Sequence, residues 1–111
     1  MQGLICLDFD QPTKRRSAII RNNRNYFLSN IQPNEEFIDS LFFCNCLTYE
    51  QSQFIGRQRL NRDKNDELLY FIRSFSETKF LNFVKGLRQT NHKTVARIMD
   101  NGGGLQSKTL L

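Results

Sequence analysis

Apolar residues recur at intervals of three and four positions along most of this sequence, the spacing that places them on one face of an α-helix. The clearest example follows the i, i+3, i+4, i+7 pattern and comprises Phe80, Phe83, Val84 and Leu87. Alternation of apolar and polar residues, which is typical of a half-buried strand, almost never persists over the length of a strand. The pattern therefore predicts an all-α fold.

Six helices are expected. The first extends from Thr13 to about Ile31, and it should bend at residues 22–25 because asparagine side chains compete for backbone hydrogen bonds. The sixth runs from about Lys93 to Asp100. After the first, each helix begins near a side chain that can cap it, in chain order Asn34, Thr48 (with Gln51 completing a capping box), Asp63, Ser76 and Asn91.

The apolar positions of these helices predict one shared core within a compact antiparallel bundle over residues 13–101. Besides the four residues above, side chains expected to face it include Phe37, Ile38, Leu41, Phe42, Phe54, Ile55, Leu68, Leu69, Ile72, Phe75, Val95, Ile98 and Met99. Tyr70 and Phe71 should widen the apolar face of the fourth helix. Residues 1–12 and 102–111 are expected to be flexible flanks.

The composition agrees with one small domain and argues against several classes of protein. The chain has 111 residues, of which 39% are hydrophobic, and its 10 Phe supply side chains large enough to fill a core. No apolar run approaches the ~20 residues needed to cross a bilayer. Asp8 and Asp10 lie where a secretory signal would carry positive charge. The odd number of cysteines, with Cys44 and Cys46 two positions apart, favours reduced thiols and a cytoplasmic location.

The net charge of +5 is unevenly distributed along the chain. Residues 13–32 contain five basic and no acidic side chains, whereas residues 33–47 contain three acidic and no basic ones. The simplest interpretation of the carboxylates is that they stabilise a helix dipole. The basic residues most simply form a solvated helix face that includes Lys14, Arg16, Arg21 and Arg24. Together, the adjacent segments of opposite charge predict a surface with two poles and favour a protein partner over nucleic acid.

No constellation of catalytic or metal-binding residues is recognisable in the sequence. Cys44 and Cys46 are separated by one residue, whereas zinc ligands are typically separated by two to four, and His92 cannot complete a tetrahedral set. A catalytic pair of Cys44 and His92 is conceivable, but a structural thiol at the end of a helix is the simpler interpretation. The glycine run at 102–104 follows a helix, whereas a phosphate-binding loop precedes one. We therefore expect neither an enzyme nor a cofactor or metal site.

Three segments resemble a known family. The stretch FLNFVKGLRQTNHKTVARIMDNGG at residues 80–103, the helix start at residues 47–50 (LTYE) and the segment at residues 66–69 (DELL) are similar to parts of the caspase recruitment domain (CARD), a branch of the death-fold superfamily. The resemblance covers about residues 14–101. It implies a six-helix antiparallel Greek-key bundle with a bent first helix and no catalytic activity. CARDs bind other CARDs, and many stack into helical oligomers that promote caspase activation in apoptosis or signalling in innate immunity.

Members of this family commonly pair a basic surface on the first and fourth helices with an acidic surface on the second and third. Carried over to this chain, the basic surface comprises Arg21, Arg24, Arg62 and Lys64. The acidic surface comprises Glu35, Glu36, Asp39 and Glu50. The chain departs from the family pattern in its fourth helix, because positive charge often continues there in basic members and is replaced here by Asp66 and Glu67.

The resemblance implies a signalling adaptor whose partner is another CARD protein or a second copy of this chain, without nucleic acid or membrane. Two alternatives remain open at this point. Within the same family, a CARD without an effector domain can act as an inhibitory decoy that caps a partner's oligomer. In a different class, a basic helical domain with a pI near 9.4 can bind nucleic acid through phosphate contacts.

Overall fold

The computed structural model describes residues 12–101, and this part of the chain contains seven helices and no strand. The predicted all-α fold class is therefore confirmed for the described residues. The flanks expected at 1–12 and 102–111 lie outside this range, except for Pro12, which is the first residue of α2. In chain order the helices are α2 (Pro12–Asn22), α3 (Arg24–Asn30), α4 (Glu35–Phe43), α5 (Tyr49–Gly56), α6 (Asn61–Ile72), α7 (Glu77–Gln89) and α8 (Lys93–Asn101).

The first predicted helix is divided into α2 and α3 at Asn23, so the expected bend is confirmed. Nδ2 of Asn23 donates a hydrogen bond of 2.9 Å to the carbonyl oxygen of Ile19, an interaction that competes with the backbone hydrogen bonds of the helix. The backbone of Asn23 leaves the helical region, with φ −117° and ψ 19°. Because of this break, α2 packs against α8 while α3 packs against α6.

Three predicted caps are present. The side chain of Asn34 accepts a hydrogen bond of 2.9 Å from the backbone N–H three residues later, and Ser76 accepts one of 3.1 Å in the same way. Thr48 and Gln51 form the expected capping box, in which each side chain accepts from the other residue's backbone N–H at 3.0 and 2.9 Å. These bonds satisfy backbone groups that the first turns of α4, α5 and α7 leave unpaired.

Two predicted caps are wrong. Helix α6 begins after Leu60, whose side chain makes no capping hydrogen bond, and Asp63 lies in the first turn instead. The carboxylate of Asp63 is still well placed there, because negative charge is favoured near a helix N-terminus. Helix α8 begins at Lys93, so Asn91 lies one residue too early to be its cap. Asn91 adopts a left-handed conformation, with φ 72°, in the turn that leads into α8.

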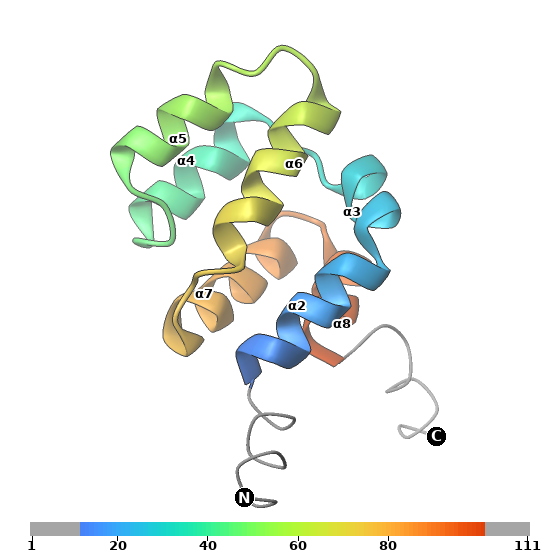
Figure 1. Cartoon of the computed structure of the whole chain (residues 1–111). Coiled ribbons are helices and arrows are strands. Elements are labelled where there is room, and N and C mark those ends of the chain that lie inside the picture. The colour runs from blue at the N-terminus through green and yellow to red at the C-terminus, as the bar shows by residue number, and fades with distance from the viewer. Residues whose placement is uncertain (1–11, 102–111) are drawn as a thin grey trace, which may run out of the picture.

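Helix α6 runs between α5 on one side and α3 on the other (Figure 1). Most of the predicted core residues are buried, but Phe54 and Tyr70 are 39% and 65% exposed. Both contact Phe71 at the surface between α5 and α6, with ring centroids 6.3 and 5.8 Å from it. The largest fully buried side chains are Phe27, Phe37, Phe83, Ile20, Ile31, Leu41, Ile55, Leu68, Ile72, Leu87, Met99 and Val84. Phe42, Phe71 and Ile98 are half-buried.

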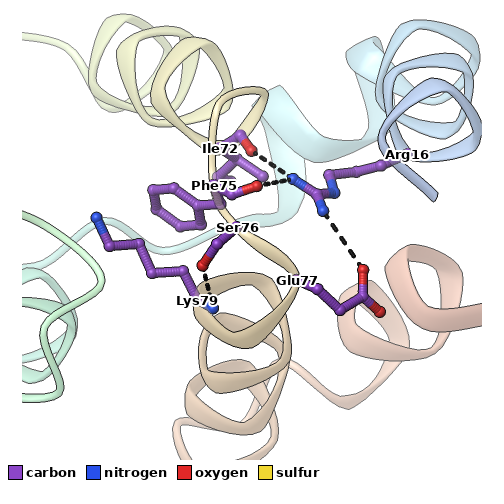
Figure 2. A network of polar contacts seen from close by, with 6 residues as sticks. All are labelled: Arg16, Ile72, Phe75, Ser76, Glu77 and Lys79. Carbon is purple, nitrogen blue, oxygen red and sulfur yellow. Dashed lines mark hydrogen bonds and ion pairs between the residues drawn. The ribbon is translucent and has the colours of Figure 1, made fainter. Parts of the chain in front are cut away.

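A buried arginine joins α2 to the connection between α6 and α7 (Figure 2). The side chain of Arg16 is 3% exposed, and its Nη1 donates to the carbonyl oxygens of Ile72 at 3.3 Å and Phe75 at 2.6 Å. Its Nη2 lies 3.8 Å from Oε1 of Glu77, and its guanidinium carbon lies 4.4 Å from the centroid of the Phe80 ring. The interpretation of Arg16 as part of a solvated face is therefore wrong. Its side chain instead satisfies carbonyl groups at and beyond the end of α6.

A buried asparagine donates hydrogen bonds to carbonyl groups at the end of α3. Asn65 of α6 has no exposed surface, and its Nδ2 donates to the carbonyl oxygens of Leu28 at 3.0 Å and Ile31 at 2.9 Å. These carbonyls lie at the C-terminal end of α3, where the helix offers them no partner of its own. Asn65 thus holds α3 against α6 through the same bonds that complete the end of α3.

His92 joins the start of α8 to the chain that follows α3. Its Nε2 accepts a hydrogen bond of 2.8 Å from the backbone N–H of Gln32, so the neutral ring carries its proton on Nδ1. Nδ1 then donates to Oγ1 of Thr90 at 2.9 Å, while the Thr90 hydroxyl donates to the carbonyl oxygen of Gly86 at 2.8 Å. Burial lowers the pKa of His92, which favours this neutral form.

Candidate protein-interaction surfaces

The four residues predicted to form the acidic surface lie on two neighbouring helices. Glu35, Glu36 and Asp39 are on α4 and Glu50 is in the first turn of α5, and all four are exposed. The dipole of α4 favours the negative charge of Glu35 and Glu36 in its first turn. None of the four forms an ion pair with another residue in the range 12–101. We refer to these four residues as the acidic surface.

Three of the four predicted basic residues lie on α2, α3 and α6, and the fourth, Lys64, lies in a groove with Glu35 and Asp39. Arg21 lies at the end of α2, Arg24 at the start of α3 and Arg62 at the start of α6, and all three are exposed. Nη2 of Arg24 donates to Oδ1 of Asp66 at 2.5 Å, and both side chains are about half exposed. Arg24 is therefore already paired within its own molecule. We refer to Arg21, Arg24 and Arg62 as the basic surface.

The Arg24–Asp66 pair borders a hollow of about 210 Å³ where α2 and α3 meet α6. Two basic residues, Arg24 and Arg73, and two acidic residues, Asp66 and Glu67, line it together with Ile20, Leu69 and Tyr70. The charge of this hollow is therefore balanced. The departure from the family pattern at Asp66 and Glu67 thus has a structural counterpart, because both carboxylates line the same hollow as Arg24, which was expected to bind a partner.

Lys64 lies with the acidic residues instead of the other basic ones. It lines a groove of about 390 Å³ between α4, α5 and α6, together with Glu35, Asp39 and Arg57. Arg57 follows the last turn of α5 and was not among the predicted site residues. The sequence places Lys64 on the fourth predicted helix correctly, but the rotation of α6 turns it toward α4 and α5.

The acidic surface and Arg21 and Arg24 belong to helices on opposite sides of α6. Helix α4 packs against α5, α5 against α6, and α6 against α3. In Figure 1, α4 and α5 lie on one side of α6. Helix α3 lies on the other side, with α2 below α3 in this view. A molecule with this arrangement presents opposite charges in two directions, and the acidic side of one copy is complementary to the basic side of another.

Exposed aromatic side chains border the acidic surface at the connection from α4 to α5. Phe43 is 76% exposed and Tyr49 is 59% exposed. The ring of Phe42 lies between them in contact, with centroids 5.5 Å from Phe43 and 6.0 Å from Tyr49. Phe43 and Tyr49 were not among the predicted site residues, although helical spacing already leaves Phe43 off the apolar face that contains Leu41 and Phe42. Exposed aromatic residues beside a charged rim are enriched at protein interfaces.

The two cysteines at the end of α4 are free thiols in close contact. Cys44 is exposed and Cys46 is buried, and their sulfur atoms are 3.3 Å apart. Cys46 Sγ also donates to the carbonyl oxygen of Lys79 at 3.6 Å. Burial, together with the hydrogen bond to Cys44, raises the pKa of Cys46 to about 12. The ring nitrogens of His92 bond to Gln32 and Thr90, so His92 forms no catalytic pair with Cys44.

Within residues 12–101, no three side chains among His, Cys, Asp and Glu are grouped so that they could hold a metal ion. Nor does any helix of this range have the length and apolar character that crossing a membrane requires. Comparisons with protein-family models, with curated proteins and with solved structures find no match. The charged and aromatic side chains described above are therefore the basis for a functional proposal.

Proposed function

We propose that this chain is a CARD-type protein-interaction domain, which binds another CARD or a second copy of itself in a signalling assembly of apoptosis or innate immunity. One observation carries the proposal: the acidic surface consists of four exposed carboxylates that have no ion-pair partner among the described residues. Charges of this kind steer a complementary partner and set the register of its docking. Arg21 and Arg24, on the other side of α6, supply the complementary charge.

The helical architecture also supports the proposal. If α2 and α3 are counted as one broken helix, the described chain has the six helices that the resemblance to CARDs implies. The break at Asn23 corresponds to the bent first helix of that family. We infer an antiparallel Greek-key arrangement for these helices on the strength of the resemblance.

Docking of the acidic surface on the basic surface of a second copy is a heterologous contact, because two different patches meet. Each added copy leaves one free surface of each kind, so the assembly grows head to tail as an open helix unless its rotation closes a ring. The charged residues set register and encounter rate, whereas Phe43 and Tyr49 supply apolar area. Salt should weaken this assembly, because exposed charges are screened.

Charge reversal on each surface tests the proposal. We expect Asp39→Arg and, separately, Arg21→Glu to abolish self-association at low ionic strength, as measured by light scattering during size-exclusion chromatography. Arg21 is preferred to Arg24 for this test because reversal of Arg24 would also place two carboxylates together beside Asp66. Lys85→Glu, at an exposed position on α7, is the control for charge reversal as such and should assemble like the wild type.

Mixing the two variants sharpens the test. Arg21→Glu retains an intact acidic surface and Asp39→Arg an intact basic surface, so an equimolar mixture should form a one-to-one heterodimer that cannot grow further. A wild-type chain that stays monomeric at high concentration and low salt would contradict self-association. Equal assembly of the wild type and both variants would contradict the charged contact.

The two alternative functions predict other outcomes. An inhibitory decoy would bind a partner CARD through one surface only and shorten the partner's oligomers. A nucleic-acid-binding domain would bind generic duplex or single strands tightly, with an affinity that falls steeply with salt. The carboxylates of Asp66 and Glu67 beside Arg24 and Arg73 oppose phosphate binding. We therefore expect weak binding of nucleic acid at physiological salt in a fluorescence-anisotropy titration.

A further inference from the structure

The pair of cysteines between α4 and α5 has a geometry beyond that of two structural thiols. Cys44 Sγ and Cys46 Sγ are 3.3 Å apart, whereas the bonded distance in a disulfide is about 2.05 Å. Because Cys44 and Cys46 are two positions apart, their Cα atoms can be separated by at most about 7 Å. This limit is close to the upper end of the range of about 4.4–6.8 Å that is usual for the Cα atoms of a disulfide. Asn45 between them has φ 65°, a left-handed conformation that turns the chain so that both sulfur atoms meet.

We propose that Cys44 and Cys46 are an oxidisable dithiol that closes to an intramolecular disulfide when it meets a small-molecule disulfide such as oxidised glutathione. The sulfur atoms need to approach by little more than 1 Å to reach the bonded distance of a disulfide. This inference does not depend on the proposed interaction with another CARD.

The difference in exposure assigns the two thiols different steps. Cys44 is exposed and can be reached by a dissolved oxidant, whereas Cys46 has no accessible surface. In the first step, the Cys44 thiolate attacks one sulfur of oxidised glutathione, which forms a mixed disulfide and releases one glutathione thiolate. In the second step, Cys46 loses its proton and attacks Sγ of Cys44, which expels the second glutathione thiolate.

The two steps balance. Two cysteine thiols are oxidised to one disulfide, one molecule of oxidised glutathione is reduced to two molecules of glutathione, and the two cysteine protons end on the glutathione thiols. The second step is the slower one, because burial holds Cys46 in the thiol form and the thiolate is the attacking species. Its hydrogen bond to the Lys79 carbonyl must also break.

The test uses the full chain with Cys6→Ser, because Cys6 lies outside the described residues and would otherwise offer a third thiol. The folded protein is incubated with oxidised glutathione, remaining thiols are alkylated, and the intact mass is measured. We expect the final product to have lost two hydrogen atoms and to take up no alkylating group. Trypsin releases residues 25–57 as one peptide, since no Lys or Arg interrupts it, and the bond should map within this peptide.

Variants separate the steps. With Cys46→Ser, or with Cys46→Ala if the serine variant does not fold, the reaction should stop at a glutathione adduct on Cys44. With Cys44→Ser, the folded chain should remain unmodified, because the remaining thiol is buried. The proposal is overturned if the Cys6→Ser chain stops at the glutathione adduct, forms covalent dimers or remains fully reduced.

Discussion

Arg24 at the start of α3 and Asp66 of α6 form an ion pair within the same molecule, with 2.5 Å between Nη2 and Oδ1. Both side chains are about half exposed, so the pair contributes at most about 1 kcal/mol to the free energy of unfolding. Asp66 also occupies one nitrogen of the guanidinium group that a partner's carboxylate would bind. Intramolecular pairing and assembly therefore compete for Arg24.

Asp66→Asn should strengthen self-association several-fold, because it releases Arg24 for a partner. The free energy of unfolding should change by less than about 1 kcal/mol. Asp100→Asn is a matched control, since it changes the net charge equally and breaks the exposed pair of Arg88 and Asp100, whose atoms are 3.0 Å apart. Sedimentation velocity at low ionic strength measures the self-association of both variants. Equal strengthening by the two variants would attribute the effect to net charge and contradict the role given to Arg24.

Arg16→Met should destabilise the fold by about 1–3 kcal/mol, because it leaves the buried carbonyl group of Phe75 without its donor and removes the second of two hydrogen bonds to the Ile72 carbonyl. Urea denaturation measures the loss. Arg21→Met, on the exposed face of the same helix, is the control and should change the free energy of unfolding by less than about 0.5 kcal/mol. Arg16→Lys should fall between the two, because its ammonium group retains the charge but lacks the planar fork. Similar stability of Arg16→Met and the wild type would show that the buried network is dispensable.

Lowering the pH should destabilise the fold through His92. Burial lowers its pKa in the folded chain below the ordinary value of 6.5, so the unfolded chain binds more protons as the pH falls. The contribution of neutral His92 is complete above pH ~6.5 and is lost as the pH falls toward the pKa of the folded state, with a slope of at most about 1.4 kcal/mol per pH unit. His92→Gln should remove this slope between pH ~7 and ~5.5 in urea titrations. Parallel pH profiles of variant and wild type would refute the assignment.

Gly86→Ala should stabilise the protein by about 0.5–1 kcal/mol, because glycine inside a helix costs conformational entropy. A Cβ atom at this position of α7 would lie 3.5 Å from Cδ2 of Leu41, an ordinary van der Waals contact. Gly86→Val is the contrasting variant, since its extra methyl groups have to fit against Leu41 and should destabilise the fold. Thermal unfolding of the two variants checks the prediction. A loss of stability with alanine would mean that the contact at Leu41 is tighter than the structure indicates.

The predictable parts of this fold are those in which the interacting groups are close in sequence. Asn34 and Ser76 accept hydrogen bonds from backbone groups three residues away, and Asn23 donates to Ile19 four residues earlier. All the atoms involved lie within one helical turn, so the order of residues is sufficient to identify the interaction. The start of α6 was misplaced at Asp63 because no side chain caps that helix.

The buried polar residues were only partly accessible to sequence reasoning. Arg16 lies four positions before the buried Ile20, and Asn65 lies three before the buried Leu68, so helical periodicity places both on an apolar face. This position indicates a polar residue in the core but does not identify its partner. The Ile72 carbonyl that Arg16 binds is 56 residues away along the chain.

By itself, the sequence determined that the described chain is helical, where its helices lie and break, and which apolar side chains fill most of its core. These properties follow from periodicity and from hydrogen bonds between near neighbours. Only the tertiary structure decided how the charged residues are grouped: it paired Arg24 with Asp66 and placed Lys64 beside Glu35 and Asp39. Contacts between charges on different helices depend on how each helix is rotated, and that rotation results from burying all the apolar faces together.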